Sequence, residues 1–224
     1  NVADYAAKQT ALIAGWRRAW GEPDAPFYGV LIAPMDYSKW EKFPVTDAAL
    51  PAFWAEQVKA LSAAHAGYVV TTDLVANVHD IHPTDKRDVG LRLARLALAE
   101  TYGRADLPAH GPTFAAMRAT GNSIELTFDH ADGLRSRDGR PLTGFVVSGK
   151  ENTFQPADAR IEDGKVVVSS PVVAAPIAVR FAWSETANPN LINGAGLPAV
   201  PFRTDDWPLF YLRSGPAGNP DANK

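Results

Sequence analysis

Hydrophobic positions in the first hundred residues follow two alternating patterns. Apolar side chains recur at helical spacing in three segments, near 2–20, 51–61 and 85–102, which predicts three helices. Between these segments lie two short and continuous apolar runs, 27–32 and 68–72, which predict strands covered on both faces. The order helix, strand, helix, strand, helix predicts an α/β sheet that is at least partly parallel.

The predicted helices carry side chains whose spacing indicates how they face their surroundings. In the first helix, Leu12, Trp16 and Trp20 recur at helical spacing and form an apolar stripe. In the third helix, Asp88 and Arg92 are separated by one helical turn. We expect these two residues to face outward as a favourable i,i+4 ion pair.

The second half of the chain has a different composition, rich in Gly, Pro and short β-branched runs. Residues 123–128 alternate between apolar and polar, and residues 145–148 and 178–183 form further strand-like runs. Asp163-Gly164 stands between two more such runs and is a hairpin signal. The spacing of these strands and turns predicts a small β-sandwich.

These differences in composition and pattern divide the chain into three parts. We assign residues 1–107 to the α/β part, 108–213 to the predicted β-sandwich, and 214–224, which are rich in Gly, Pro and Asn, to a flexible tail. Two strands are too few for a stable doubly wound sheet. We therefore expect the missing strands to lie upstream of Asn1, in a portion of the protein that precedes this chain.

Composition narrows the classes of partner. The formal net charge is −3, and Lys and Arg form no block, so neither nucleic acid nor an anionic membrane is an expected partner. No apolar run approaches the roughly 20 residues that span a bilayer. The chain has no cysteine, which excludes disulfides, thiolate catalysis and cysteine-based zinc sites within it.

The loop from 74 to 83 carries the candidate chemistry, because it follows a predicted buried strand and contains His79-Asp80-Ile81-His82-Pro83. Reactive groups of open α/β sheets collect in such loops. A histidine there can activate a serine hydroxyl while a carboxylate fixes its tautomer. Two other interpretations stay open: a surface loop with turns made by Asp and Pro, and a metal site that adds Asp73. The latter lacks a recognised zinc spacing, and we predict no metal and no cofactor.

The motif Asp80-Ile81-His82-Pro83 is followed by Asp88-Val89-Gly90 and by Thr101-Tyr102-Gly103, and this succession resembles the histidine block of the sialate O-acetylesterase family. Two later segments resemble the C-terminal signature of the same family, namely 179–183 and Pro201-Phe202-Arg203-Thr204-Asp205-Asp206-Trp207. The match covers nearly the whole chain in the expected order, and several motifs in register are more specific than the histidine loop alone.

The resemblance implies a fold, an activity and a location. The chain would be the C-terminal part of an SGNH-type three-layer α/β/α hydrolase domain, followed by the small β-sandwich. The enzyme would be a serine esterase that removes O-acetyl groups from sialic acid or related sugars. No serine here has the context of the family's nucleophile, so the N-terminal portion of the same protein would supply it as a partner. The family implies a periplasmic or secreted protein.

The resemblance also assigns residues to the site. His82 matches the family's histidine, and Asp80 is our choice for its partner. Many SGNH enzymes space these residues as Asp-x-x-His, but the residue three before His82 is His79, so Asp73 at the strand end is the alternative. Asn1 could close the family's Gln-Gly-Glu-x-Asn block near the oxyanion hole, or it could cap the first helix.

Three further residues have two possible roles each. Arg203 could bind a sugar carboxylate through its planar guanidinium, or it could tie its loop to a nearby aspartate. Tyr37 and Trp40 could stack on a sugar, or they could pack in the core. A different function also remains possible, in which the chain is a non-catalytic carbohydrate-binding fragment that acts through its β-sandwich.

Overall fold

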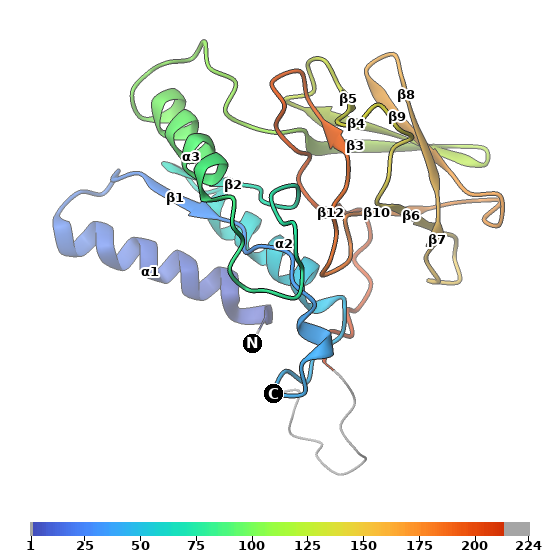
Figure 1. Ribbon diagram of the computed structural model, residues 1–224, viewed down its shortest axis with the longest axis horizontal. Helices are drawn as coiled ribbons and strands as arrows, with labels where there is room; N and C mark the ends of the chain where they lie inside the picture. The colour runs from blue at the N-terminus through green and yellow to red at the C-terminus, as the bar shows by residue number, and fades with distance from the viewer. Residues whose placement is uncertain (1, 213–224) are drawn as a thin grey trace.

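The computed structural model describes residues 2–212 and has two parts, one with helices around a pair of parallel strands and one built of antiparallel sheets (Figure 1). Two predictions fall outside the described residues: the oxyanion-hole role of Asn1 and the flexible tail at 214–224. The predicted mixed α/β architecture is confirmed.

The first part follows the predicted order of helices and strands. Its elements are η1 (Val2–Asp4), α1 (Tyr5–Trp20), β1 (Phe27–Val30), η2 (Tyr37–Lys39), α2 (Ala49–Leu61), β2 (Ala66–Val69) and α3 (Lys86–Glu100). Strands β1 and β2 pair in parallel, with Phe27 opposite Ala66 and Val30 opposite Val69. The parallel pairing confirms the expectation drawn from the hydrophobic pattern.

Two glycines allow helices to approach this strand pair from opposite faces. A Cβ atom on Gly29 would lie 2.5 Å from Leu61 of α2, and a Cβ atom on Gly67 would lie 3.1 Å from Leu96 of α3. Both leucines are buried. The absence of a side chain at each glycine therefore lets α2 pack on one face and α3 on the other.

The prediction that the first strand is covered on both faces is wrong at its end. Val30 and Ile32 are each 36% exposed. Among the described strands, β1 pairs with β2 alone, so its other edge has no neighbouring strand. The apolar stripe of α1 is also uncovered, since Leu12 and Trp16 are exposed and Trp20 is 65% exposed. Apolar side chains of α1 and β1 are thus open to solvent in the described chain.

The second part consists of two four-stranded antiparallel sheets and a short strand pair. One sheet has the order β3 (Thr113–Thr120), β4 (Ser123–Asp129), β9 (Lys165–Ser169), β8 (Asp158–Glu162). The other has the order β12 (Phe202–Arg203), β10 (Ala178–Phe181), β6 (Phe145–Ser148), β7 (Gln155–Pro156). The remaining pair joins β5 (Arg135–Ser136) to β11 (Leu191–Ile192).

The predicted hairpin at Asp163-Gly164 is confirmed. Glu162 of β8 lies opposite Lys165 of β9, so the two residues between them form the whole turn. Their φ angles are 49° and 73°. A two-residue turn with positive φ at both central positions matches the right-handed twist of the strands it joins, and Asp-Gly is a favoured sequence for it.

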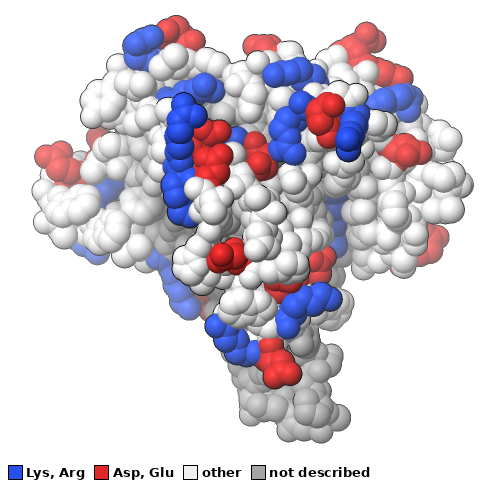
Figure 2. All heavy atoms as spheres, in the orientation of Figure 1, with Lys and Arg blue, Asp and Glu red and all other residues white. Residues whose placement is uncertain are grey.

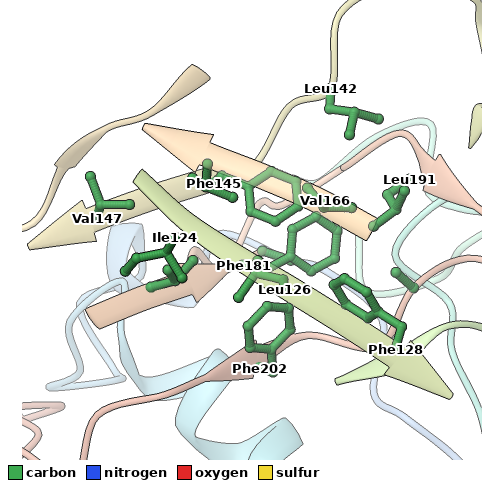
Figure 3. Close-up of a cluster of buried hydrophobic side chains, with 14 of the residues drawn as sticks. Ile124, Leu126, Phe128, Leu142, Phe145, Val147, Val166, Phe181, Leu191 and Phe202 are labelled. Carbon is green, nitrogen blue, oxygen red and sulfur yellow. The ribbon is translucent and has the colours of Figure 1, made fainter. Parts of the chain in front are cut away.

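One hydrophobic cluster draws side chains from both four-stranded sheets (Figure 3). Along β4, alternate residues Ile124, Leu126 and Phe128 are buried, as the sequence pattern predicts. From the other sheet, Phe145 and Phe181 contact each other with ring centroids 4.6 Å apart. A β-sandwich requires this packing, in which two sheets bury their inner faces against each other. The β-sandwich assignment and the boundary at residue 107 stay predictions.

The surface carries charges of both signs. On the face drawn in Figure 2, Lys and Arg side chains are interspersed with Asp and Glu, and neither sign forms a large patch. Within residues 2–212, none of the helices has both the length and the apolar character needed to cross a membrane.

The cluster predicts that replacing two phenylalanines by alanine changes the free energy of unfolding by very different amounts. Phe181 is fully buried and Phe210 is 81% exposed. We expect Phe181→Ala to lower the free energy of unfolding by about 3–5 kcal/mol, because it removes a ring from a closely packed core. Phe210→Ala is the matched control and should change it by less than about 0.5 kcal/mol. Urea denaturation checks both, and equal effects would contradict the assignment of this core.

Candidate active site

The candidate site lies in the segment from Val70 to Pro83, which follows the carboxyl end of β2 and leads into α3. The Thr71 hydroxyl donates to the carbonyl oxygen of Leu31 at 2.9 Å, which joins the ends of the two parallel strands. At the other end, the carboxylate of Asp85 accepts from the backbone N–H of Asp88 at 3.0 Å and caps α3. The loop is therefore anchored where it leaves the sheet and where it enters the helix.

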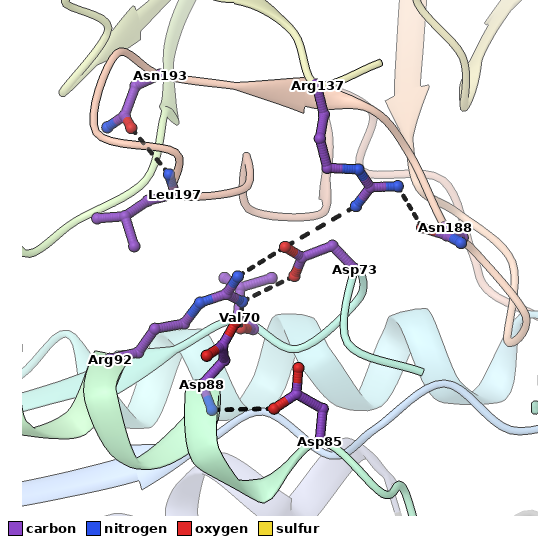
Figure 4. A network of polar contacts seen from close by, with 9 residues as sticks. All are labelled: Val70, Asp73, Asp85, Asp88, Arg92, Arg137, Asn188, Asn193 and Leu197. Carbon is purple, nitrogen blue, oxygen red and sulfur yellow. Dashed lines mark hydrogen bonds and ion pairs between the residues drawn. The ribbon is translucent and has the colours of Figure 1, made fainter. Parts of the chain in front are cut away.

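Asp73 forms a nearly buried ion pair with Arg92 of α3 (Figure 4). The two guanidinium N–H groups donate to the two carboxylate oxygens at 2.7 and 2.6 Å. Nη1 of Arg92 also donates to the Val70 carbonyl oxygen, and Arg137 of the antiparallel part lies 3.8 Å from Asp73. The prediction that Arg92 faces outward and pairs with Asp88 is wrong, because a buried carboxylate draws the guanidinium inward.

This ion pair bears on Asp73 as the alternative partner of His82. Both of its carboxylate oxygens are engaged by Arg92. The contact that the structure gives to the His82 ring is with Asp80 instead. The geometry therefore favours Asp80, which we keep as the proposed partner.

Asp80 and His82 face each other across a tight turn of the loop. Nδ1 of His82 lies 3.0 Å from Oδ1 of Asp80, and the backbone N–H of His82 donates to the same oxygen at 2.9 Å. The hydrogen bond from the backbone N–H of His82 lowers the pKa of the Asp80 carboxyl, and the hydrogen bond with the His82 ring lowers it further. Asp80 thus stays ionised at neutral pH. Pairing through Nδ1 leaves Nε2 of His82 as the nitrogen that can accept a proton.

The same loop holds a second histidine–carboxylate pair. Nδ1 of His79 lies 2.6 Å from Oδ2 of Asp36, and the backbone N–H of Asp36 donates to the Val78 carbonyl oxygen at 3.0 Å. Asp36 is buried, and its other carboxylate oxygen has no hydrogen-bond partner among residues 2–212. Sequence reasoning missed Asp36, since it precedes His79 by 43 residues and stands in no recognisable motif.

Arg203 lies in β12 and donates locally. Its Nε donates to the carbonyl oxygen of Asp205 at 2.7 Å, and its Nη2 donates to that of Trp207 at 3.0 Å. Burial lowers the pKa of Arg203. The carboxylate of Asp205 is bound by both guanidinium donors of Arg180 at 2.8 Å. These contacts tie the segment after β12 to the sheet, and none of them involves the loop of His82.

Taken together, the chain is an α/β protein with a histidine–carboxylate pair beyond the carboxyl end of a parallel strand. That position is where such folds place reactive groups. Within the described ranges, no group of three or more His, Cys, Asp or Glu side chains is arranged to hold a metal ion. The chemistry that the loop supports is proton transfer by an imidazole beside an ionised carboxylate.

A solved structure of a carbohydrate acetylesterase from Xanthomonas citri is similar to this chain. The TM-score is 0.83 and the sequence identity is 37%, over 91% of this chain and 46% of that one. The chain thus spans about half the length of the structure it matches. No protein-family model and no curated protein matches the chain. The comparison shows that this chain shares the fold of that carbohydrate acetylesterase over 91% of its own length.

The buried pair generates a stability prediction. We expect Arg92→Ala to lower the free energy of unfolding by about 3 kcal/mol, because it leaves Asp73 buried without its main cation. Arg87 is the matched control on the same helix, since its side chain is 85% exposed and lies 3.8 Å from its neighbour Asp88. Arg87→Ala should change stability by less than about 0.5 kcal/mol. Thermal and urea unfolding measure both, and a neutral Arg92→Ala would show that the pair has no structural role.

Proposed function

We propose that this chain is the C-terminal portion of a serine carbohydrate O-acetylesterase with an SGNH-type domain. The observation that carries the proposal is the Asp80–His82 contact, in a chain 37% identical to a carbohydrate acetylesterase. The family motifs around His82 suggest that the substrates are acetyl esters of sialic acid or related sugars. By the same resemblance we propose a periplasmic or secreted location.

The proposed reaction is acyl transfer through a serine that the N-terminal portion supplies. The serine oxygen attacks the acetyl carbonyl carbon while Nε2 of His82 takes the hydroxyl proton. The ionised Asp80 stabilises the imidazolium. Collapse of the tetrahedral oxyanion breaks the bond to the sugar oxygen, which receives the proton from His82. Water then attacks the acetyl-serine while Nε2 of His82 takes one of its protons. Collapse of this second tetrahedral intermediate breaks the bond to the serine oxygen, which receives the proton back from His82, and acetate is released.

The open edge of β1 supports a site completed by a further segment. A parallel pair of two strands is marginal by itself, and parallel sheets are normally covered on both faces. Gln57 of α2 binds part of this edge, accepting from the N–H of Ile32 at 3.0 Å and donating to the carbonyl oxygen of Val30 at 3.3 Å. The remainder of the edge, toward Phe27, suits the addition of a strand from the N-terminal portion.

The composite site predicts complementation. We expect this chain alone to release no nitrophenol from p-nitrophenyl acetate above the buffer rate. Its complex with the N-terminal portion of the same protein should hydrolyse the ester, because only the complex contains both serine and base. The measurement is absorbance of nitrophenolate on each part and on the mixture. Turnover by this chain alone, equal to that of the complex, would overturn the proposal.

The two loop histidines provide a matched pair of variants. His82→Ala in the complex should lower kcat roughly a thousandfold, because proton transfer by a positioned base contributes about 10²–10⁴. His79→Ala removes an imidazole from the same loop and should retain at least about a tenth of the activity. Circular dichroism verifies that both variants fold. Inactive His79→Ala beside active His82→Ala would transfer the role of base to the Asp36–His79 pair.

A further inference from the structure

A hollow of about 410 Å³ adjoins the candidate site. Its lining includes Asp80 and Ile81, the two residues that immediately precede His82. The lining also includes aromatic residues of the segment that follows β1, namely Tyr37, Trp40 and Phe43. Its volume is in the range of pockets that bind small molecules, about 300–1,000 Å³.

The three aromatic rings form a continuous wall. Trp40 and Phe43 stack with centroids 6.0 Å apart, and Tyr37 meets Phe43 edge to face at 5.5 Å. The buried residues of the two hydrophobic clusters include Trp54 but not Trp40, which stays half-exposed. Core packing therefore does not account for Trp40, which had two possible roles on sequence grounds.

Polar groups also line the hollow, beside and above these rings. The ammonium group of Lys42 lies over the rings of Trp40 and Phe43, 4.5 Å and 5.0 Å from their centroids. Burial raises the pKa of Tyr37, and the nearby Glu185 raises it further, so its hydroxyl keeps its proton. The ionised Asp80 also lines the hollow. A purely apolar ligand would desolvate these groups without hydrogen-bonding them, which costs free energy.

We propose that the hollow binds the pyranose ring that carries the acetyl ester, with Trp40 as the stacking residue. A pyranose has an apolar face of C–H groups that suits an aromatic ring, and hydroxyl groups at its edge that suit Lys42 and Tyr37. Because Asp80 contacts both the hollow and His82, a ring held there lies beside the proposed base. This inference rests on the proposed esterase function and adds the part of the site that recognises the sugar.

The test compares two variants on two kinds of ester, using the complex with the N-terminal portion. Trp40→Leu keeps apolar volume but loses the ring, and Trp40→Phe keeps a ring. With mono-O-acetylated methyl glucoside, galactoside and xyloside, Trp40→Leu should lower kcat/KM about tenfold, mainly through KM, and Trp40→Phe should restore most of it. With ethyl acetate, which has no ring, both variants should match the wild type within about twofold.

A control and a binding measurement complete the design. Trp20 is exposed on α1, so Trp20→Leu should leave both activities unchanged. Equal losses on the glycosides and on ethyl acetate, or no loss on any glycoside, would overturn the subsite. If the wild-type complex hydrolyses no ester, the esterase proposal fails, and calorimetric titration with the same glycosides decides on the subsite. The subsite is supported if the wild-type complex binds the glycosides and Trp40→Leu weakens that binding. It is overturned if the wild-type complex does not bind them.

Discussion

The carboxylate of Asp73 is almost completely buried where the chain leaves β2, and such a charge requires a cation close by. Arg92 supplies that cation from α3 and also binds the carbonyl oxygen of Val70 at the strand end. Arg137 approaches from the antiparallel part and donates to Asn188 there. One buried charge thus joins the strand end, the helix and the antiparallel part (Figure 4), and it fixes the beginning of the loop that carries His82.

A second buried carboxylate acts further along the same loop. Asp36 holds the ring of His79 through its side chain and the carbonyl of Val78 through its backbone. By contrast, the bonds described for His82 and Asp80 lie within the loop itself. The position of the proposed base therefore depends on Asp73 and Asp36, which carry no proton in the proposed reaction. Residues that position a loop and residues that react are separate here.

Local features of the fold could be predicted from the sequence, and long-range pairings could not. The Asp163-Gly164 turn and the alternation along β4 follow from neighbouring residues. On a helical wheel Arg92 lies on the outward side of α3. Its partner Asp73 lies 19 residues upstream in a loop, so the local pattern does not reveal the ion pair. Strand β3 lacks a regular alternation of buried and exposed side chains, because most of its side chains are exposed. Its strand conformation follows from its pairing with β4.

The exposure of His82 is a feature that the proposed composite enzyme would explain. Its side chain is 82% exposed in the described chain. Acyl transfer benefits from excluding water, because hydrogen bonds to a developing oxyanion are stronger in a dry site. The open edge of β1 and the loop of His82 belong to the same parallel strand pair. A segment that adds a strand at that edge would carry its own carboxyl-terminal loop toward His82. Covering the sheet and delivering the serine would then be one event.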